Sequence, residues 1–116
     1  MHATIKLWLD DERNPDDPQI QSKFYSEPGM VWVKTEEDAK KILTTGTVKF
    51  ISFDNDLGLG NGSGTSLANW IEEQTYNGKL NRLNWAIHSM NPVACKAIAW
   101  TMKSVDKYWE NHNGNN

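Results

Sequence analysis

Carboxylates follow two apolar runs of the chain. Residues 4–9 stop at Asp10 and Asp11, and residues 48–53 stop at Asp54 and Asp56. Several carboxylates in one crevice repel one another and raise each other's pKa, and a bound hard cation removes that penalty. Oxygen ligands suit Mg²⁺, or Mn²⁺ as a close substitute, and such an ion can hold a phosphate oxygen. Turn chemistry alone explains a single Asp at a strand end, but four of them favour a site for one divalent cation.

More polar side chains follow the apolar run 83–87. His88 is a candidate general acid or base, phosphate donor or metal ligand, and a structural histidine is the alternative. Ser89 carries a hydroxyl that could donate to a phosphoryl oxygen. Asn91 could also contact a phosphate, although its place before Pro92 slightly favours simple helix-start chemistry.

Arg13 and a glycine-rich run are the remaining candidates. Arg13 directly follows the acidic pair and can bind a phosphate bidentately, or else pair with Glu12 or Asp16. Residues 58–64 have glycine at every second position, and their amides could hold an anion. No Lys-Ser/Thr pair follows, so the run is not a P-loop, and we expect a mobile lid rather than a rigid cradle.

Short apolar runs alternate with helix-like segments along the chain, which predicts parallel βαβ units. The expected strands are 4–9, 30–34, 48–53 and 83–87, and the expected helices begin at 35, 66 and 92 and end near 45, 76 and 109. Residues 13–29 contain three prolines and are expected to form a long loop, with one short helical turn at 20–24. The fold class is therefore α/β, a small doubly wound parallel sheet of about four strands with helices on both faces. In such sheets the site lies beyond the carboxyl ends of the strands.

The composition fits one small domain. The chain has 116 residues, a net charge of −3, one Cys and six Trp. Residues 1–110 are expected to form the domain, and 111–116 a disordered polar tail. A single Cys and the lack of a secretory apolar region predict a cytoplasmic protein, and no run approaches the ~20 apolar residues that span a bilayer. The net charge argues against a large nucleic-acid footprint. Five of the tryptophans are expected to pack in the core, at positions 8, 32, 70, 85 and 100.

The order of these motifs resembles response-regulator receiver domains, which are flavodoxin-like. In that family an acidic pair and the Asp after the third strand hold Mg²⁺, that Asp accepts a phosphoryl group, and a hydroxyl after the fourth strand contacts it. The resemblance implies these roles for Asp10, Asp11, Asp54 and Ser89. Receivers also have a fifth strand that ends in a Lys, and no strand-like run follows residue 87 here. The missing Lys argues against phospho-signalling.

Three motifs are more similar to a divergent branch, the cyclic-phosphate processing receiver-like domains of phages and bacteria. They are LWLDDERNP at 7–15, SFDNDLG at 52–58 and HSMNP at 88–92. The resemblance implies an acidic metal site and a His that act on or bind a cyclic phosphate, in the host cytoplasm if the chain is phage-encoded. A histidine is expected in this branch where Asn55 stands, which argues against a second catalytic His.

The leading hypothesis is a divalent-metal-dependent phosphoesterase that opens a cyclic nucleotide or a 2′,3′-cyclic phosphate end. The residue roles are metal binding by Asp10, Asp11, Asp54 and Asp56, catalysis by His88 and Asp54, and phosphate binding by Arg13, Ser89 and Asn91. The cofactor is one Mg²⁺ or Mn²⁺, and the partner is a small phosphate-containing ligand, with no membrane and no nucleic acid beyond an RNA end. The alternatives are a non-catalytic cyclic-nucleotide binder and a degenerate receiver used for protein contacts. The oligomeric state stays open.

Overall fold

Four strands and four helices alternate along the chain in the computed structural model, which describes residues 4–113. The elements are β1 (Ile5–Leu9), α1 (Pro18–Phe24), β2 (Val31–Val33), α2 (Glu36–Leu43), β3 (Val48–Phe53), α3 (Gly64–Tyr76), β4 (Asn84–Ile87) and α4 (Pro92–Asn113). Among the described residues no helix has both the length and the apolar character needed to cross a membrane.

The strands form one parallel sheet in the order β2-β1-β3-β4. The chain runs outward from β1 to β2 and then crosses back to β3 and β4, so the order reverses as in a doubly wound sheet. This confirms the predicted α/β fold class. Leu9 pairs with Phe53, and the backbone N–H of Asp54 donates to the carbonyl of Leu9 at 2.9 Å. The ends of β1 and β3 therefore place Asp10 beside Asp54.

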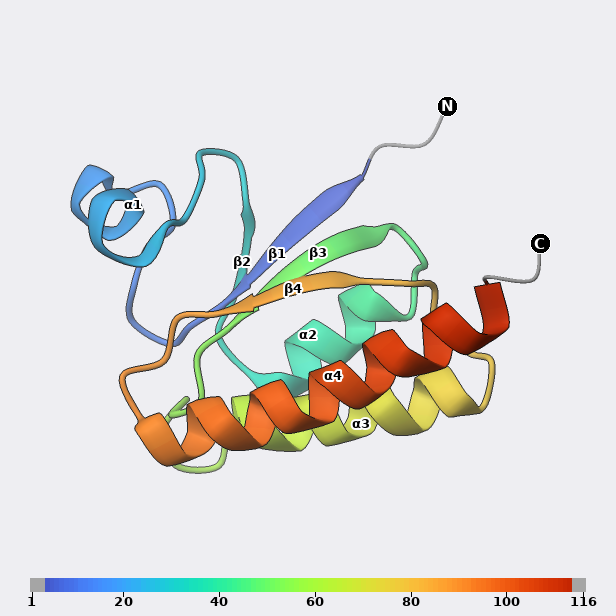
Figure 1. The fold of residues 1–116 in the computed structure, drawn as a ribbon. Coiled ribbons are helices and arrows are strands. Elements are labelled where there is room, and N and C mark those ends of the chain that lie inside the picture. Colours follow the sequence, from blue (N-terminus) through green and yellow to red (C-terminus); the bar gives the residue numbers. More distant parts are fainter. Residues whose placement is uncertain (1–3, 114–116) are drawn as a thin grey trace.

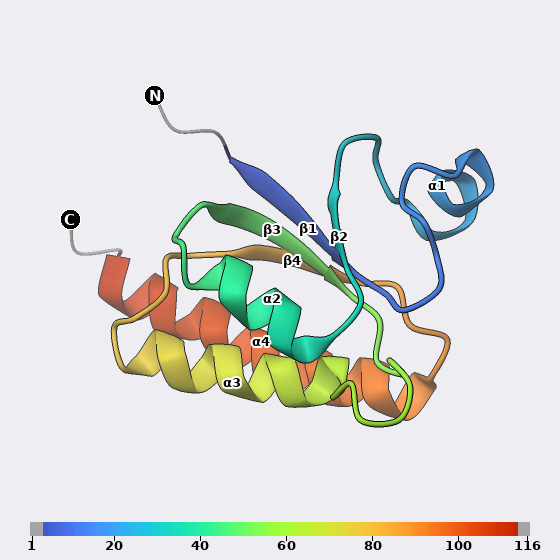
Figure 2. The ribbon, with the colours of Figure 1, turned by 180° about the vertical axis from the view of Figure 1, so that it is seen from behind.

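The helices are divided unequally between the two faces of the sheet. Figures 1 and 2 show α2, α3 and α4 together in one layer against the same face. Alternate residues of β1 and β3 enter the core there: Leu7, Leu9, Ile51 and Phe53, all fully buried. The seven-residue α1 lies at the carboxyl end of the sheet, where Phe24 meets the ring of His88 on the second face. The expectation of helices on both faces thus holds only at that end, because α1 is too short to follow a strand.

Two segments are more helical than the sequence predicts. Pro18 occupies the first turn of α1 and the Asp17 side chain accepts the N–H of Gln19, so the expected turn at 20–24 is a capped helix. At the other end α4 continues to Asn113, past the predicted end at 109. The tail expected at 111–116 thus continues α4 as far as Asn113, and 114–116 lie outside the described residues.

The tryptophans do not all pack in the core. Trp8 is fully buried, whereas Trp32, Trp70 and Trp85 are partly buried. Trp100 is 81% exposed, so the prediction of a core position is wrong for this residue. It lies on α4 opposite the buried Ile98 and Met102, and the helical period alone does not say which stripe faces the core.

Candidate functional site

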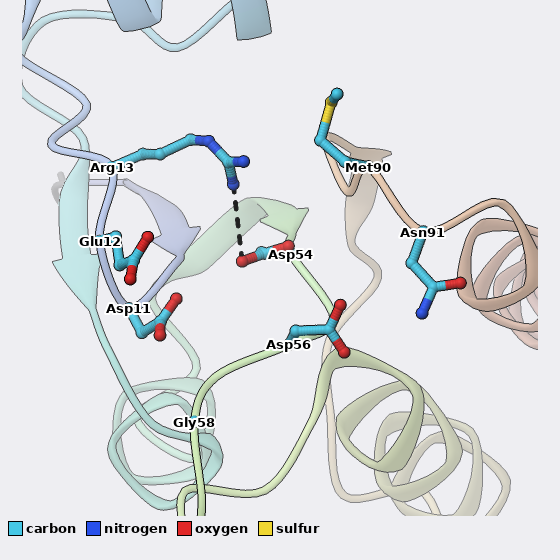
Figure 3. Close-up of a pocket in the computed structure, with 8 residues that line it drawn as sticks. All are labelled: Asp11, Glu12, Arg13, Asp54, Asp56, Gly58, Met90 and Asn91. Carbon is cyan, nitrogen blue, oxygen red and sulfur yellow. Dashed lines mark ion pairs between the residues drawn. The ribbon is translucent and has the colours of Figure 1, made fainter.

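A polar pocket lies beyond the carboxyl ends of β1, β3 and β4 and has a volume of about 380 Å³. Its wall combines three loops, as Figure 3 shows. The lining residues are Asp11, Glu12, Arg13, Asp54, Asp56, Gly58, Met90 and Asn91. Four carboxylates in this wall face one guanidinium, so acidic groups predominate in the wall.

Asp10 lies directly behind this wall and is fully buried. Its Oδ1 accepts the backbone N–H groups of Glu12 and Arg13, both at 2.8 Å. Its Oδ2 accepts Nη1 of Arg13 at 3.1 Å and pairs with Nε2 of His88 at 3.0 Å. Burial alone would raise the pKa of Asp10, but these hydrogen bonds, the His88 bond first, lower it to about 2. All four lone-pair directions of the carboxylate are occupied.

His88 is held between Asp10 and the buried Ser52. Its ring stacks on Trp8 with 3.7 Å between centroids, and Nδ1 lies 2.8 Å from Oγ of Ser52. Burial lowers the pKa of His88, although the Asp10 bond opposes this, so the ring is neutral at pH 7. The ionised Asp10 can only accept, which puts the single ring proton on Nε2 and makes Nδ1 the acceptor of the Ser52 hydroxyl.

The predicted general acid or base therefore has both nitrogens engaged. The side chain of His88 is 2% exposed, and the residue is not among those that line the pocket. In this geometry it orients the Asp10 carboxylate and does not reach a ligand in the pocket.

His88→Phe is expected to keep the ring on Trp8 but to remove both hydrogen bonds. The loss leaves Ser52 without its partner and Asp10 with one donor fewer, which should cost about 2 kcal/mol of unfolding free energy. The Asp10 pKa should also rise, so stability should be lost at a higher pH on acidification. Ser52→Ala is the matched control, because it leaves the Asp10 bond in place and should shift only the unfolding midpoint. Urea unfolding of the three proteins between pH 3 and 7 measures both effects.

Asp54 ends β3 and is almost fully buried. Its Oδ1 accepts the N–H of Asn55 at 2.8 Å, and its Oδ2 lies 3.7 Å from Nη1 of Arg13. Burial, followed by repulsion from Asp10, raises the pKa of Asp54 to about 6, against the opposing effects of Asn55 and Arg13. Its ionised form is therefore disfavoured at this position, as expected of a group that a cation would stabilise.

Arg13 lies between the two buried aspartates. The same Nη1 atom contacts Oδ2 of Asp10 and approaches Oδ2 of Asp54, and Figure 3 shows the guanidinium reaching across the pocket mouth to Asp54. Its Cζ lies 4.4 Å from the centroid of the Phe24 ring, so α1 supports the side chain. The predicted alternative of an ion pair with Glu12 or Asp16 is not found, and the partners are Asp10 and Asp54.

Three of the four predicted metal ligands come together. Asp10, Asp11 and Asp54 each offer one oxygen, and these oxygens lie within 4.8 Å of one another. The hard donors and their mutual repulsion fit a divalent cation. Asp11 faces the pocket, whereas Asp10 has no lone pair left while Arg13 and His88 hold it. Asp56 lines the same pocket outside this cluster, where Nδ2 of Asn55 donates to its Oδ1 at 3.1 Å.

The predicted phosphate ligands after β4 differ in position. Oδ1 of Asn91 accepts the N–H of Ala94 at 3.1 Å, which is the predicted helix-start chemistry, yet Asn91 also lines the pocket. Its Nδ2 points away from the helix in Figure 3. The hydroxyl of Ser89 accepts the backbone N–H of Asn91 at 3.1 Å, and Ser89 is not among the lining residues. Sequence reasoning gave no site role to Glu12 and Met90, although both stand inside the motifs at 7–15 and 88–92.

The glycine-rich run is fixed in place. Glu36, almost fully buried at the start of α2, accepts the N–H of Ser63 at 3.3 Å and the hydroxyl of Ser66 at 2.9 Å. Gly62 has φ +80°, and a Cβ at that position would collide with the Glu36 side chain. The loop also holds itself, since Asn61 donates to the carbonyl of Leu57 at 2.8 Å. These contacts describe an anchored pocket wall and not the expected mobile lid.

These features define a class of protein: a four-stranded receiver-like α/β domain with an acidic pocket at the carboxyl edge of its sheet. A sequence model of the cyclic-phosphate processing receiver domain matches residues 5–104, and the chain belongs to this family. No curated protein and no solved structure gives a significant match.

Proposed function

We propose that this protein is a divalent-metal-dependent phosphoesterase that opens a cyclic phosphate. One observation carries the proposal: three carboxylate oxygens within 4.8 Å of one another share a pocket edge with the guanidinium of Arg13. A cation there would supply positive charge to a phosphate oxygen and activate water. Membership of the cyclic-phosphate processing family supports a cyclic phosphate as the ligand.

The proposed roles follow the positions of the side chains. Asp11 and Asp54 would hold the cation directly, because their carboxylates line the pocket. Asp10 would add charge and stay oriented by His88, and would become a direct ligand only if Arg13 moved away. Asp56, which lies outside the three-oxygen cluster, would act through a water.

Arg13 acts as the counter-ion of Asp10 and Asp54. A cation bound to Asp54 would repel the guanidinium of Arg13, whose side chain is 28% exposed, and would turn it towards a phosphate in the pocket. There it can donate two parallel hydrogen bonds, and Nδ2 of Asn91 supplies a further donor from the opposite wall. In hydrolysis water adds to the phosphorus, one ring P–O bond breaks, and the released oxygen takes up a proton.

Arg13→Gln is expected to change metal and phosphate binding in opposite directions. Removal of the competing positive charge should tighten Mg²⁺ or Mn²⁺ binding by about 3- to 10-fold. Binding of a cyclic nucleotide to the metal-loaded protein should weaken by a similar factor or more. Isothermal titration with metal alone, and then with ligand at saturating metal, separates the two effects. A variant that weakens both or neither would contradict the exchange of partners.

A second candidate function is binding without chemistry. The observation that favours it is the engagement of both nitrogens of His88, which leaves the described pocket wall without a histidine, lysine or tyrosine. The protein would then sequester or sense a cyclic nucleotide with the same residues.

One screen tests both candidates. Cyclic 2′,3′- and 3′,5′-nucleotides and an oligoribonucleotide with a 2′,3′-cyclic end are incubated with the protein and Mg²⁺, Mn²⁺ or EDTA. Melting shifts report binding, and mass spectrometry reports the gain of one water. The enzyme predicts a metal-dependent product that Asp54→Asn abolishes, and the binder predicts a shift without product. No shift and no product with any compound would contradict both.

A further inference from the structure

The outer face of α4 combines exposed lysines with an exposed tryptophan. Val93, Lys96, Trp100, Lys103 and Lys107 follow one another at steps of three or four residues, and all five are exposed. At 100° per residue they fall within one narrow stripe of the helix. The buried stripe of the same helix, Ala94, Ile98, Met102 and Val105, lies on the opposite side. The exposed stripe therefore points directly away from the core.

The exposure of Trp100 is not explained by packing. Its side chain is 81% exposed, and it has no ring contact, cation–π contact or hydrogen bond among the described residues. The neighbouring lysines also have no ion-pair partner within the described part of the chain, where the lysine pairs involve Lys6 and Lys40. A lysine on a solvent face is ordinary, but an indole that stays in water between two unpaired lysines leaves a stacking surface and several positive charges available to a ligand.

We propose that this face of α4 binds single-stranded nucleic acid. Stacking of an unpaired base on the indole and pairing of backbone phosphates with lysine ammonium groups are the two elements of sequence-tolerant binding to single strands. The rise of 1.5 Å per residue puts Lys96 and Lys103 roughly 10 Å apart along the helix, with Trp100 between them. A strand that follows the stripe can therefore stack one base and place phosphates on both sides of it.

Other partners fit the stripe less well. A protein interface is depleted of lysine at its centre and needs a contiguous apolar area, but the only apolar members here are Val93 and Trp100. A duplex has no unpaired base to stack on the indole. Acidic side chains on α4 do not neutralise the lysines along most of the stripe. The first acid of the helix is Asp106, whose carboxylate accepts the Nε1 hydrogen of Trp85, and the second is Glu110, beyond the last lysine of the stripe.

The stripe begins beside the pocket. Asn91 lines the pocket and immediately precedes α4, and Trp100 lies nine residues further on, roughly 13 Å along the helix. Binding along α4 does not depend on the chemistry proposed for the pocket, although a strand bound there would have its end near it.

The test is fluorescence anisotropy with a labelled U12 oligonucleotide. We expect binding whose log K falls with log salt at a slope of about −2, the value for three phosphate contacts to a single strand. Trp100→Ala should weaken binding about tenfold, while Trp100→Phe should retain much of it. Lys103→Gln with Lys107→Gln should reduce the slope by more than half. The control with equal charge change is Lys41→Gln with Lys79→Gln, an exposed lysine on α2 and one in the loop after α3, and it should leave the slope unchanged.

Additional measurements distinguish nucleic-acid binding on α4 from binding in the pocket and from binding of other partners on α4. Asp54→Asn should bind U12 like the wild type. Binding on α4 is thereby tested independently of the phosphoesterase activity proposed for the pocket. The proposal is overturned by no binding at 20 mM salt, by equal losses in the lysine pair and its control, or by equal affinity for a polyglutamate 12-mer. It is overturned as well if sedimentation shows a dimer that Trp100→Ala dissociates, because the stripe would then bind a second copy.

Discussion

Asp54→Asn is expected to stabilise the metal-free protein at neutral pH and to abolish its response to divalent cations. The carboxylate is buried beside Asp10, and this environment raises the pKa of Asp54 to about 6 from an ordinary value of 3.8. Such a shift means that the ionised form is disfavoured in the folded state by on the order of 2–3 kcal/mol. Asparagine has the same shape and no charge, and can still accept the N–H of Asn55, so it should remove this penalty.

The gain in unfolding free energy expected for Asp54→Asn depends on pH, because Asp54 is ionised only above its folded pKa. A group whose pKa is raised by folding stabilises the folded state below its unfolded value, and that stability is lost as the pH rises through the folded value. For Asp54 the loss falls between about pH 4 and 6. The advantage of Asp54→Asn should therefore be full above pH 7 and vanish below pH 4. Asp10 has the opposite sign, because its pKa is lowered to about 2 and its stability is lost as the pH falls through that value.

Thermal melts across this pH range, with EDTA and with Mg²⁺ or Mn²⁺, measure both parts of the prediction. The cation should raise the melting temperature of the wild type at pH 7.5 and leave Asp54→Asn unchanged. Asp38→Asn, a change at an exposed position on α2, controls for net charge. A variant that is less stable than the wild type at pH 7.5 would show that the buried charge of Asp54 does not destabilise the fold. A variant that keeps the full metal shift would show that Asp54 is not a ligand.

Gly64→Ala is expected to destabilise the protein and to disturb the pocket, although alanine favours a helix. Gly64 is the first residue of α3 and lies against the end of β3, where its N–H donates to the carbonyl of Asn55 at 3.1 Å. A Cβ at Gly64 would collide with the backbone carbonyl of Asp54. The obstacle is backbone, so no side-chain rotation can relieve it. We expect the collision to lower the unfolding free energy by about 3 kcal/mol, which exceeds the gain of about 1 kcal/mol from the higher helix propensity of alanine.

The effect on the site should exceed the effect on stability alone. Movement of the Asp54 carbonyl also moves its carboxylate relative to Asp11, so the metal affinity should fall as well. Gly78→Ala is the control, because that glycine has φ +73° with nothing near its Cβ position and lies far along the chain from the pocket residues. It should lose about 1 kcal/mol and keep its metal affinity. Equal losses of stability and of metal affinity in the two variants, measured by calorimetry and metal titration, would contradict the proposed collision of a Gly64 Cβ with the Asp54 carbonyl.

The sequence predicts the carboxyl edge of the sheet well, for a physical reason. The apolar runs before Asp10 and Asp54 have the length and composition of buried strands, and parallel neighbours bring their carboxyl ends together. This pairing of β1 with β3 brings Asp10 and Asp11 close to Asp54. The resemblance to the cyclic-phosphate processing receiver domains is also confirmed, because the family model matches residues 5–104.

The partners of individual side chains are not readable from the chain order. His88 follows a strand just as the aspartates do, but its ring turns towards Trp8 and Ser52 on the open face of the sheet and not into the pocket. Arg13 pairs with Asp54, 41 positions away in the sequence, through a loop whose shape is set by the backbone hydrogen bonds to Asp10. Such choices depend on rotamers and loop geometry, which periodicity does not encode.

The exposed Trp100 and the anchored glycine loop show the same limit. Composition predicts that a tryptophan is buried, but α4 has its apolar stripe on the other side. Alternate glycines predict mobility, but a single buried carboxylate, Glu36, holds the loop from a neighbouring helix. The exposure of Trp100 therefore follows from the side of α4 that packs on the sheet, and the fixed position of the glycine loop from a contact with a residue distant in the sequence.

³¹P NMR of a 2′,3′-cyclic nucleotide is the most direct test of the proposed metal-dependent opening of a cyclic phosphate in this pocket. The spectrum is followed with the wild type and Mg²⁺, with the wild type and EDTA, and with Asp54→Asn and Mg²⁺. We predict that the cyclic signal converts to a phosphomonoester signal only in the first sample. A signal that is perturbed by the protein but never converted, or that converts equally in EDTA, would contradict the claim.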